Sequence, residues 1–317
     1  MSAKKNLDKF VLGSAQFGMQ YGINNSIEPS IDLVTEILKQ AIDAGITKID
    51  TARAYGNSEL ILGNFFSTLD PSNNLHITTK LSPLSEFDEK HSQSVSSLKK
   101  AIDNSLRASI ENLQIKTIDC LMLHRASHLF QNEGIILEEL SKYKEVNLIR
   151  SIGVSVQTPD ELELVLAIDN ISQIQMPFNI LDSRWVSSIE LIKKEKKNRQ
   201  IKIFTRSAFL QGLLLSDSRE KWSAAHALNN YRDVLSSLKS FQVKFNRGSL
   251  SDLLINYVIG HDWIDGVVIG VDNSIQLLEN IEIFQNKVLS SDELEYIDMN
   301  KPKVSKRTLN PAIWKNP

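Results

Sequence analysis

The stretch SIDLVTEILKQAIDAGITKIDTARAYG, residues 30–56, contains one repeating unit of the fold. Its first half places apolar residues at the three-and-four spacing of a helix face, with Ser30 positioned to cap the start and Gly45 positioned to end it. A short apolar segment, residues 47–51, follows at once and predicts a buried strand. The stretch therefore predicts a helix that leads into a strand, and the strand ends in a polar segment.

The same unit recurs along the chain. Seven more apolar segments have the composition of strands, at residues 10–14, 76–80, 118–124, 149–155, 172–175, 201–207 and 266–270. Amphipathic segments alternate with them, near residues 57–68, 93–113, 133–146, 158–169, 185–197, 248–260 and 274–287. Strands that are apolar along their whole length need cover on both faces, so this order predicts an α/β protein with a closed (β/α)8 TIM barrel.

No Pro-rich linker and no internal repeat divides the sequence, so we expect residues 1–317 to form a single domain. The segment 211–247 interrupts the alternation of strands and helices and is expected to hold one extra helix over a rim of the barrel.

Composition narrows the classes of function. With 42% hydrophobic residues, the chain has enough apolar surface for a large core, and a net charge of -2 gives no electrostatic reason to expect nucleic acid. No apolar run reaches the length of a membrane span or follows the first lysines as a signal sequence would, so we expect a cytoplasmic protein without membrane contact. The single cysteine, Cys120, lies inside an apolar run, and we expect neither a disulfide nor a metal site.

Four polar side chains stand where predicted strands end. Asp50, Lys80 and His124 end the second, third and fourth strands, and Tyr55 lies on the loop after the second. Each alone has a structural explanation, as a cap, a snorkelling lysine, a satisfied histidine or a loop packing residue. Because the carboxyl ends of barrel strands share one mouth, we expect the four groups to lie together.

This set of groups suits proton transfer to a carbonyl oxygen. An ammonium beside the Tyr55 phenol favours the phenolate form, and a carboxylate paired with that ammonium keeps it charged. Tyr55 can then exchange a proton with an alkoxide, while His124 donates a hydrogen bond to the same oxygen. No side chain can supply a hydride, so a reduction requires a nicotinamide cofactor.

Eight segments, in order along nearly the whole chain, resemble those of the aldo-keto reductases. They are VLGSAQFG at 11–18, IDTARAYG at 49–56, ITTK at 77–80, LMLHR at 121–125, IGVSV at 152–156, IQMPFN at 174–179, RSAFLQGLL at 206–214 and VVIGVDNSIQLLEN at 267–280. The resemblance implies a catalytic tetrad of Asp50, Tyr55, Lys80 and His124, with Tyr55 as the proton donor.

The resemblance also implies a cofactor site. It places Ser155 and Gln175 at the nicotinamide carboxamide, and Arg206 where an aromatic residue commonly stacks on the nicotinamide ring. Towards the pyrophosphate and the adenosine it places the remaining residues, Ser207, Gly270, Asp272, Gln276 and Asn280. The chain departs from the family at Val156, where Asn is usual.

Asp272 bears on the choice of cofactor. It stands where members that prefer NADP carry Arg or Lys for the 2′-phosphate, so the cofactor is NAD or NADP with NAD favoured. The alternative is that Asp272 caps the helix that begins near Ser274.

We therefore expect an NAD(P)-dependent oxidoreductase of carbohydrate metabolism, acting on a small carbonyl or sugar substrate as a monomer or weak homodimer. One alternative is a cofactor-binding regulatory protein of the same fold with little turnover. Another is a lyase or isomerase that uses Lys80 as a Schiff base, although a lysine paired with Asp50 is a poor nucleophile.

Features of the predicted mouth leave the substrate open. Arg53, Arg125 and Arg206 suit an acidic or heavily hydroxylated substrate, or else form structural pairs. The pocket walls are expected from the loops 82–92, 125–132 and 209–246 and from the C-terminal segment with Trp314.

Overall fold

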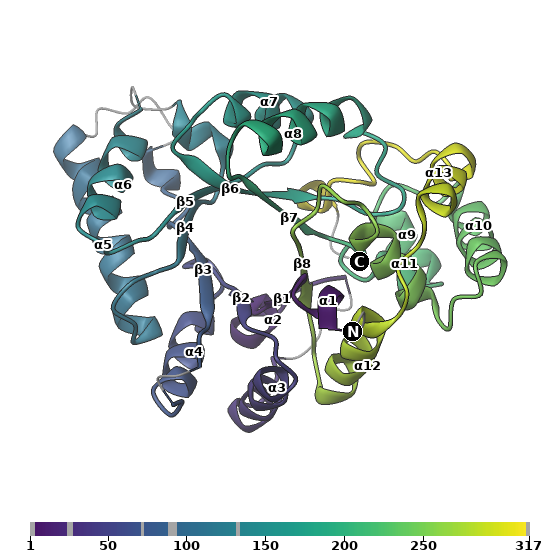
Figure 1. The fold of residues 1–317 in the computed structure, drawn as a ribbon, viewed down its shortest axis with the longest axis horizontal. Helices are drawn as coiled ribbons and strands as arrows, with labels where there is room; N and C mark the ends of the chain where they lie inside the picture. The colour runs from purple at the N-terminus through teal and green to yellow at the C-terminus, as the bar shows by residue number, and fades with distance from the viewer. Residues whose placement is uncertain (1–3, 24–27, 71–72, 88–93, 131–133, 315–317) are drawn as a thin grey trace.

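The centre of the computed structural model, which describes residues 4–23, 28–70, 73–87, 94–130 and 134–314, is a closed barrel of parallel strands (Figure 1). The strands are β1 Phe10–Gly13, β2 Lys48–Asp50, β3 His76–Lys80, β4 Cys120–Leu123, β5 Ile152–Ser155, β6 Ile171–Pro177, β7 Lys202–Arg206 and β8 Gly266–Gly270. Each strand pairs with the next, and β8 closes the sheet against β1 with Val268 opposite Val11. The predicted TIM barrel is confirmed.

The helices form a layer around the barrel (Figure 1). In chain order they are α1 Lys4–Leu7, α2 Ala15–Gly18, α3 Ile31–Asp43, α4 Ser58–Phe66, α5 Val95–Leu113, α6 Ile135–Glu145, α7 Pro159–Leu166, α8 Val186–Asn198, α9 Arg219–Ala224, α10 Tyr231–Lys244, α11 Leu250–Ile259, α12 Ser274–Gln285 and α13 Ser291–Asn300. All the helices expected between strands are present, with ends that differ from the predicted ones by a few residues.

Helix α3 shows how local sequence produces these elements. The Ser30 side chain accepts a hydrogen bond from the Leu33 amide at 3.3 Å and so caps the helix. Gly45 follows the helix with a φ of +91°, a conformation that costs little without a Cβ. The buried face of α3 packs on the barrel, and the turn at Gly45 leads the chain directly into β2.

The segment between β7 and α11 holds more structure than expected. Two helices, α9 and α10, occupy it in place of the one extra helix predicted. Helix α13 was not predicted either, because it buries only Leu294 and Ile297 and shows little apolar periodicity. It packs beside α10, with the rings of Phe241 and Tyr296 6.4 Å apart, on the outside of the barrel (Figure 1).

Two findings bear on the expected class of protein. Among the described helices, none combines the length and the apolar character that a membrane span requires. Cys120 is buried in β4, and burial raises the pKa of its thiol to about 12, so it remains a neutral core side chain.

His261 gives the fold a sensitivity to acid. Its ring lies 5.0 Å from the ring of Tyr257 and 5.2 Å from that of Phe178, and burial lowers its pKa from 6.5 to about 4. The unfolded chain therefore binds a proton here that the folded chain refuses, and stability falls as the pH decreases from 6.5 towards 4.

We expect the variant His261→Phe to lose this pH dependence of stability. When the pH is lowered from 7 to 5, the wild type should lose about 2 kcal/mol more unfolding free energy than the variant. The histidine accounts for about 1.4 kcal/mol per pH unit below 6.5. Urea unfolding of both proteins at the two pH values measures this difference. An equal difference at pH 7 and pH 5 would show that His261 is protonated equally in the folded and unfolded chains.

Candidate active site

The carboxyl ends of β2 and β3 hold a buried ion pair. Asp50 Oδ1 lies 2.6 Å from Lys80 Nζ, and the two residues are only 2% and 1% exposed. The Gln175 side chain, on β6 across the barrel, donates a hydrogen bond to Asp50 Oδ2 at 2.7 Å. Lys80 Nζ also donates to the Thr51 carbonyl at 3.0 Å. Both charges are thus compensated and held in place.

Tyr55 and His124 complete the group that the sequence predicted. Lys80 Nζ lies 5.0 Å from the centroid of the Tyr55 ring. The His124 ring meets the Tyr55 ring edge-on, with centroids 6.3 Å apart and an angle of 89°. A phenol, an imidazole, an ammonium and a carboxylate therefore lie together at the mouth.

A tight turn after β2 places Tyr55. The Arg53 amide donates to the Lys80 carbonyl at 3.2 Å, and the Tyr55 amide donates to the Ala52 carbonyl at 3.0 Å. Gly56 has a φ of +54°, and a Cβ on it would overlap the carbonyl oxygen of Gly18. Only glycine fits this contact between the loops after β1 and β2.

Two serines link the segments that follow β1 and β2 by hydrogen bonds. Ser58 Oγ donates to Ser14 Oγ at 2.7 Å, and Ser14 Oγ donates to the Asp50 carbonyl at 3.0 Å. Sequence reasoning missed this link, because each serine by itself is an ordinary loop or helix-start residue. The segment VLGSAQFG therefore supports the strand end that carries Asp50.

Burial controls the charge states at this site. Burial raises the pKa of Tyr55 above 10, and the nearby Lys80 ammonium opposes this without overcoming it. Lys80 favours the phenolate, as expected, but in the protein without ligands the desolvation of the phenol outweighs this one neighbouring charge. Tyr55 is a protonated phenol here.

The other two titrating groups have defined states as well. Burial would lower the pKa of Lys80, but Asp50 and Tyr55 outweigh it and raise the pKa, so the ammonium stays charged. Burial, together with the positive charges of Lys80 and Arg206, lowers the pKa of His124 to about 4. His124 is therefore a neutral imidazole at pH 7.

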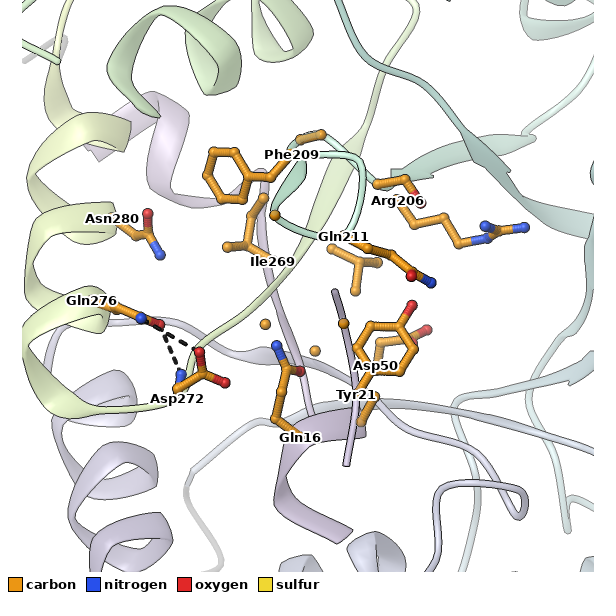
Figure 2. A pocket seen from close by; sticks show the side chains of 18 of the residues that line it. Gln16, Tyr21, Asp50, Arg206, Phe209, Gln211, Ile269, Asp272, Gln276 and Asn280 are labelled. Carbon is orange, nitrogen blue, oxygen red and sulfur yellow. Dashed lines mark hydrogen bonds between the residues drawn. The ribbon is translucent and has the colours of Figure 1, made fainter. Parts of the chain in front are cut away.

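A cavity of about 340 Å³ leads from this group to the start of α12 (Figure 2). Asp50 and Tyr55 line one end of it. Most of the predicted cofactor residues line it too, namely Gln175, Arg206, Ser207, Gly270, Asp272, Gln276 and Asn280. Ser155 is buried at the end of β5 and is not among the lining residues.

Other lining residues were not named individually by the sequence, although Phe209 and Gln211 lie in the loop 209–246 that was expected to form a wall. Gln16, Tyr21, Phe209 and Gln211 point into the cavity from the loops after β1 and β7 (Figure 2). These residues lie inside the segments VLGSAQFG and RSAFLQGLL or just beyond them. Their position directly after a strand was the feature of the sequence that could have identified them as lining residues.

The two loops meet over the cavity. The Ile23 amide donates to the Gln211 carbonyl at 3.1 Å.

Of the loops expected to form the walls, only residues 209, 211, 212 and 215 contribute to the lining among the described residues. The described parts of the loops 82–92 and 125–132, and Trp314, lie elsewhere; residues 88–92 and 131–132 fall outside the described ranges.

The contacts at the far end of the cavity exclude the interpretation of Asp272 as a helix cap. The cap of α12 is Asn273, whose side chain accepts from the Gln276 amide at 2.9 Å, so Asp272 is not the cap. Asp272 instead lies beside the Gln276 side chain, which accepts a hydrogen bond from the Asp272 amide at 2.8 Å (Figure 2). The Gln276 amide nitrogen lies 3.5 Å from the Asp272 carboxylate. Both predicted cofactor residues line the cavity as a pair.

Arg53, one of the three mouth arginines, has a structural role. Its guanidinium lies 2.6 Å from the buried carboxylate of Glu59, which also accepts a hydrogen bond from Thr79 at 2.7 Å. The described residues contain no group of three or more His, Cys, Asp or Glu side chains arranged to hold a metal ion.

Known proteins resemble this chain over most of its length. The model of the aldo/keto reductase family matches residues 9–300. The D-arabinose 1-dehydrogenase of Saccharomyces cerevisiae is 25% identical, over 93% of this chain and 90% of its own. The D-galacturonate reductase of Fragaria ananassa is also 25% identical, over 86% and 84% of the two chains.

A solved structure resembles the chain in fold. The holo form of aldo-keto reductase AKR11C1 from Bacillus halodurans has a TM-score of 0.72 at 20% identity and covers 95% of both chains. At that level of identity the likeness supports the barrel architecture alone.

Proposed function

Because this chain belongs to the aldo/keto reductase family, we propose that it is a nicotinamide-dependent oxidoreductase that interconverts a carbonyl and an alcohol, with Tyr55 as general acid and base. The observation that carries the proposal is the juxtaposition of Tyr55 with the Asp50–Lys80 ion pair and with His124. A phenol beside an ammonium is suited to give a proton to an oxygen that gains negative charge.

The cavity fits a dinucleotide. It continues from Tyr55 to Ser207, Gln276 and Asn280, whose hydroxyl and amide groups suit phosphates and ribose hydroxyls. Gln175 lines the same cavity, is hydrogen-bonded to Asp50 and would contact the carboxamide. When bound, the nicotinamide supplies or accepts the hydride.

The side chains have separate roles in the proton transfer. Tyr55, protonated in the free protein, donates its proton to the substrate oxygen during reduction and takes it back during oxidation. Neutral His124 donates a hydrogen bond to the same oxygen and orients the carbonyl. Lys80 stabilises the phenolate left by proton transfer, and Asp50 keeps Lys80 charged and in place.

The substrate class is a small aldehyde, ketone or sugar. The relatives named for D-arabinose and D-galacturonate support hydroxylated substrates for this chain. Oxidation of NADH and NADPH with a panel of sugars, sugar lactones and simple aldehydes tests the proposal. Tight cofactor binding without turnover on any member of the panel would favour the regulatory alternative. Covalent trapping of Lys80 with borohydride would instead favour Schiff-base chemistry.

We also propose that the protein accepts NAD(H) at least as well as NADP(H). Two carboxylates line the cavity on the α12 side, Asp272 just before this helix and Glu279 within it. Among the described lining residues Arg206 is the one Lys or Arg, and it lies at the opposite end from Asp272 (Figure 2). A phosphate a few ångströms from a carboxylate is repelled by about 1 kcal/mol or more at a partly exposed site.

We expect NADH to bind at least as tightly as NADPH, and Asp272→Asn to shift the ratio of dissociation constants several-fold towards NADPH. Titration of each cofactor against tryptophan fluorescence measures both constants. Glu282→Gln, on the same helix outside the lining, controls for a general loss of negative charge. Wild-type protein that binds NADPH tenfold tighter than NADH would refute this selectivity.

A further inference from the structure

Charges at the catalytic end of the cavity do not cancel. Asp50 and Lys80 neutralise each other at 2.6 Å. Tyr55 is a protonated phenol and His124 a neutral imidazole at pH 7. Among the described residues that line the cavity, the charge that remains at this end is that of Arg206, which lines it together with Asp50 and Tyr55.

Arg206 has a neutral partner. Its Nη2 donates to the side-chain oxygen of Gln157 at 2.8 Å, and it takes part in none of the ion pairs found among the described residues. In contrast, Arg53 and Arg184 each lie 2.6 Å from a carboxylate. A guanidinium has five N–H donors, so the bond to Gln157 orients Arg206 and leaves donors and a full charge for a ligand.

Gln157 is itself held on several sides. Its side-chain nitrogen lies 3.4 Å from the Asn310 side-chain oxygen, and its carbonyl accepts from Arg184 at 3.3 Å. Its amide donates to the carboxylate of Glu161, the residue that completes the capping box of α7. The side chain that orients Arg206 is therefore fixed by the C-terminal segment and by α7.

We propose that Arg206, positioned by Gln157, binds a carboxylate of the substrate, so that the preferred substrates are carbonyl compounds that also carry an acid group. This inference rests on the proposed function, because it concerns the same site. On the α12 side the cavity is lined by the carboxylates of Asp272 and Glu279, so a substrate carboxylate is favoured at the Arg206 end. A charge-assisted bond from a planar guanidinium suits the two oxygens of a carboxylate.

The test compares two aldehydes that differ mainly in charge, 4-carboxybenzaldehyde and 4-carbamoylbenzaldehyde. We expect wild-type kcat/KM to be at least roughly tenfold higher for the carboxylate, the scale of a charge-assisted hydrogen bond. Added salt should reduce this preference, because it screens the interaction. Arg206→Gln should bring the ratio near one, and Arg206→Lys should restore part of it.

Gln157→Glu tests the positioning role while keeping Arg206. A carboxylate at residue 157 gives Arg206 a charged partner, so the preference for the acid substrate should fall at least several-fold while NADH binding stays within a few-fold of wild type. Arg150→Gln is the matched control: Arg150 pairs with Asp119 at the opposite end of the barrel and should leave the ratio unchanged.

The outcomes separate the two proposals. Turnover of neither aldehyde, nor of any member of the sugar and aldehyde panel, would refute the proposed function itself. Equal kcat/KM for the two aldehydes would overturn the carboxylate site and leave the proposed function standing. An Arg206→Gln variant that loses NADH affinity but keeps the wild-type ratio would also overturn it, since Arg206 would then serve the cofactor alone.

Discussion

We expect Tyr55→Phe to lower kcat by roughly two to four powers of ten, the usual contribution of a general acid. The phenol is protonated because burial raises its pKa, so it is the proton donor available next to the carbonyl oxygen. The ring remains in the variant and keeps its edge contact with His124, so the dissociation constant of NADH should stay near wild type.

Steady-state turnover with the best aldehyde of the panel measures this effect, and NADH fluorescence reports cofactor binding. Tyr231→Phe serves as the control, because the Tyr231 hydroxyl accepts a hydrogen bond from Arg232 at 3.2 Å and Tyr231 is not among the residues that line the cavity. If Tyr55→Phe turns over within a few-fold of wild type, Tyr55 is not the proton donor.

Lys80→Met should affect both stability and the pH profile. It leaves the buried Asp50 carboxylate without its charged partner, a change that costs about 3–5 kcal/mol of unfolding free energy in comparable buried pairs. It also removes the largest charge that opposes the burial of Tyr55, so the pKa of the phenol rises further. Alcohol oxidation requires the phenolate, so its pH optimum should move upward.

The double variant Asp50→Asn with Lys80→Met separates these effects. With the isolated carboxylate gone, stability should recover by a large part of the loss, while turnover should stay low and the pH optimum high. Urea unfolding gives the stabilities, and rates of alcohol oxidation between pH 6 and pH 10 give the profiles. An unchanged pH profile in Lys80→Met would mean that Lys80 serves only the structure.

The sequence was sufficient for the architecture and for the four groups at the mouth. Apolar periodicity depends on neighbouring residues, so the unit at residues 30–56 already predicted a helix, its caps and the strand after it. Barrel topology brings strand ends to one mouth, which is why Asp50, Lys80 and His124 were expected together. Their catalytic roles, by contrast, came from resemblance and remain proposals.

Other features depended on contacts between distant parts of the chain. The link from Ser58 to Ser14, and the different partners of Arg53 and Arg206, join residues whose spacing in sequence carries no signal. A hydrogen bond or ion pair requires atoms within about 3 Å, and only the closed barrel determines which side chains approach that closely. Helix α13 was missed for a related reason, since its apolar pattern is weak and it contacts Phe241 of α10, which lies far from it in sequence.

By itself, the sequence determined the barrel, the order of its elements and the identity of the polar groups at the strand ends. The tertiary structure alone decided the protonation of Tyr55 and the different partners of Arg53 and Arg206. Tyr55 shows the reason: the neighbouring ammonium lowers the pKa of the phenol, but the loss of water around the ring raises it more. That loss depends on all the segments that pack around the site, and no local stretch of sequence contains it.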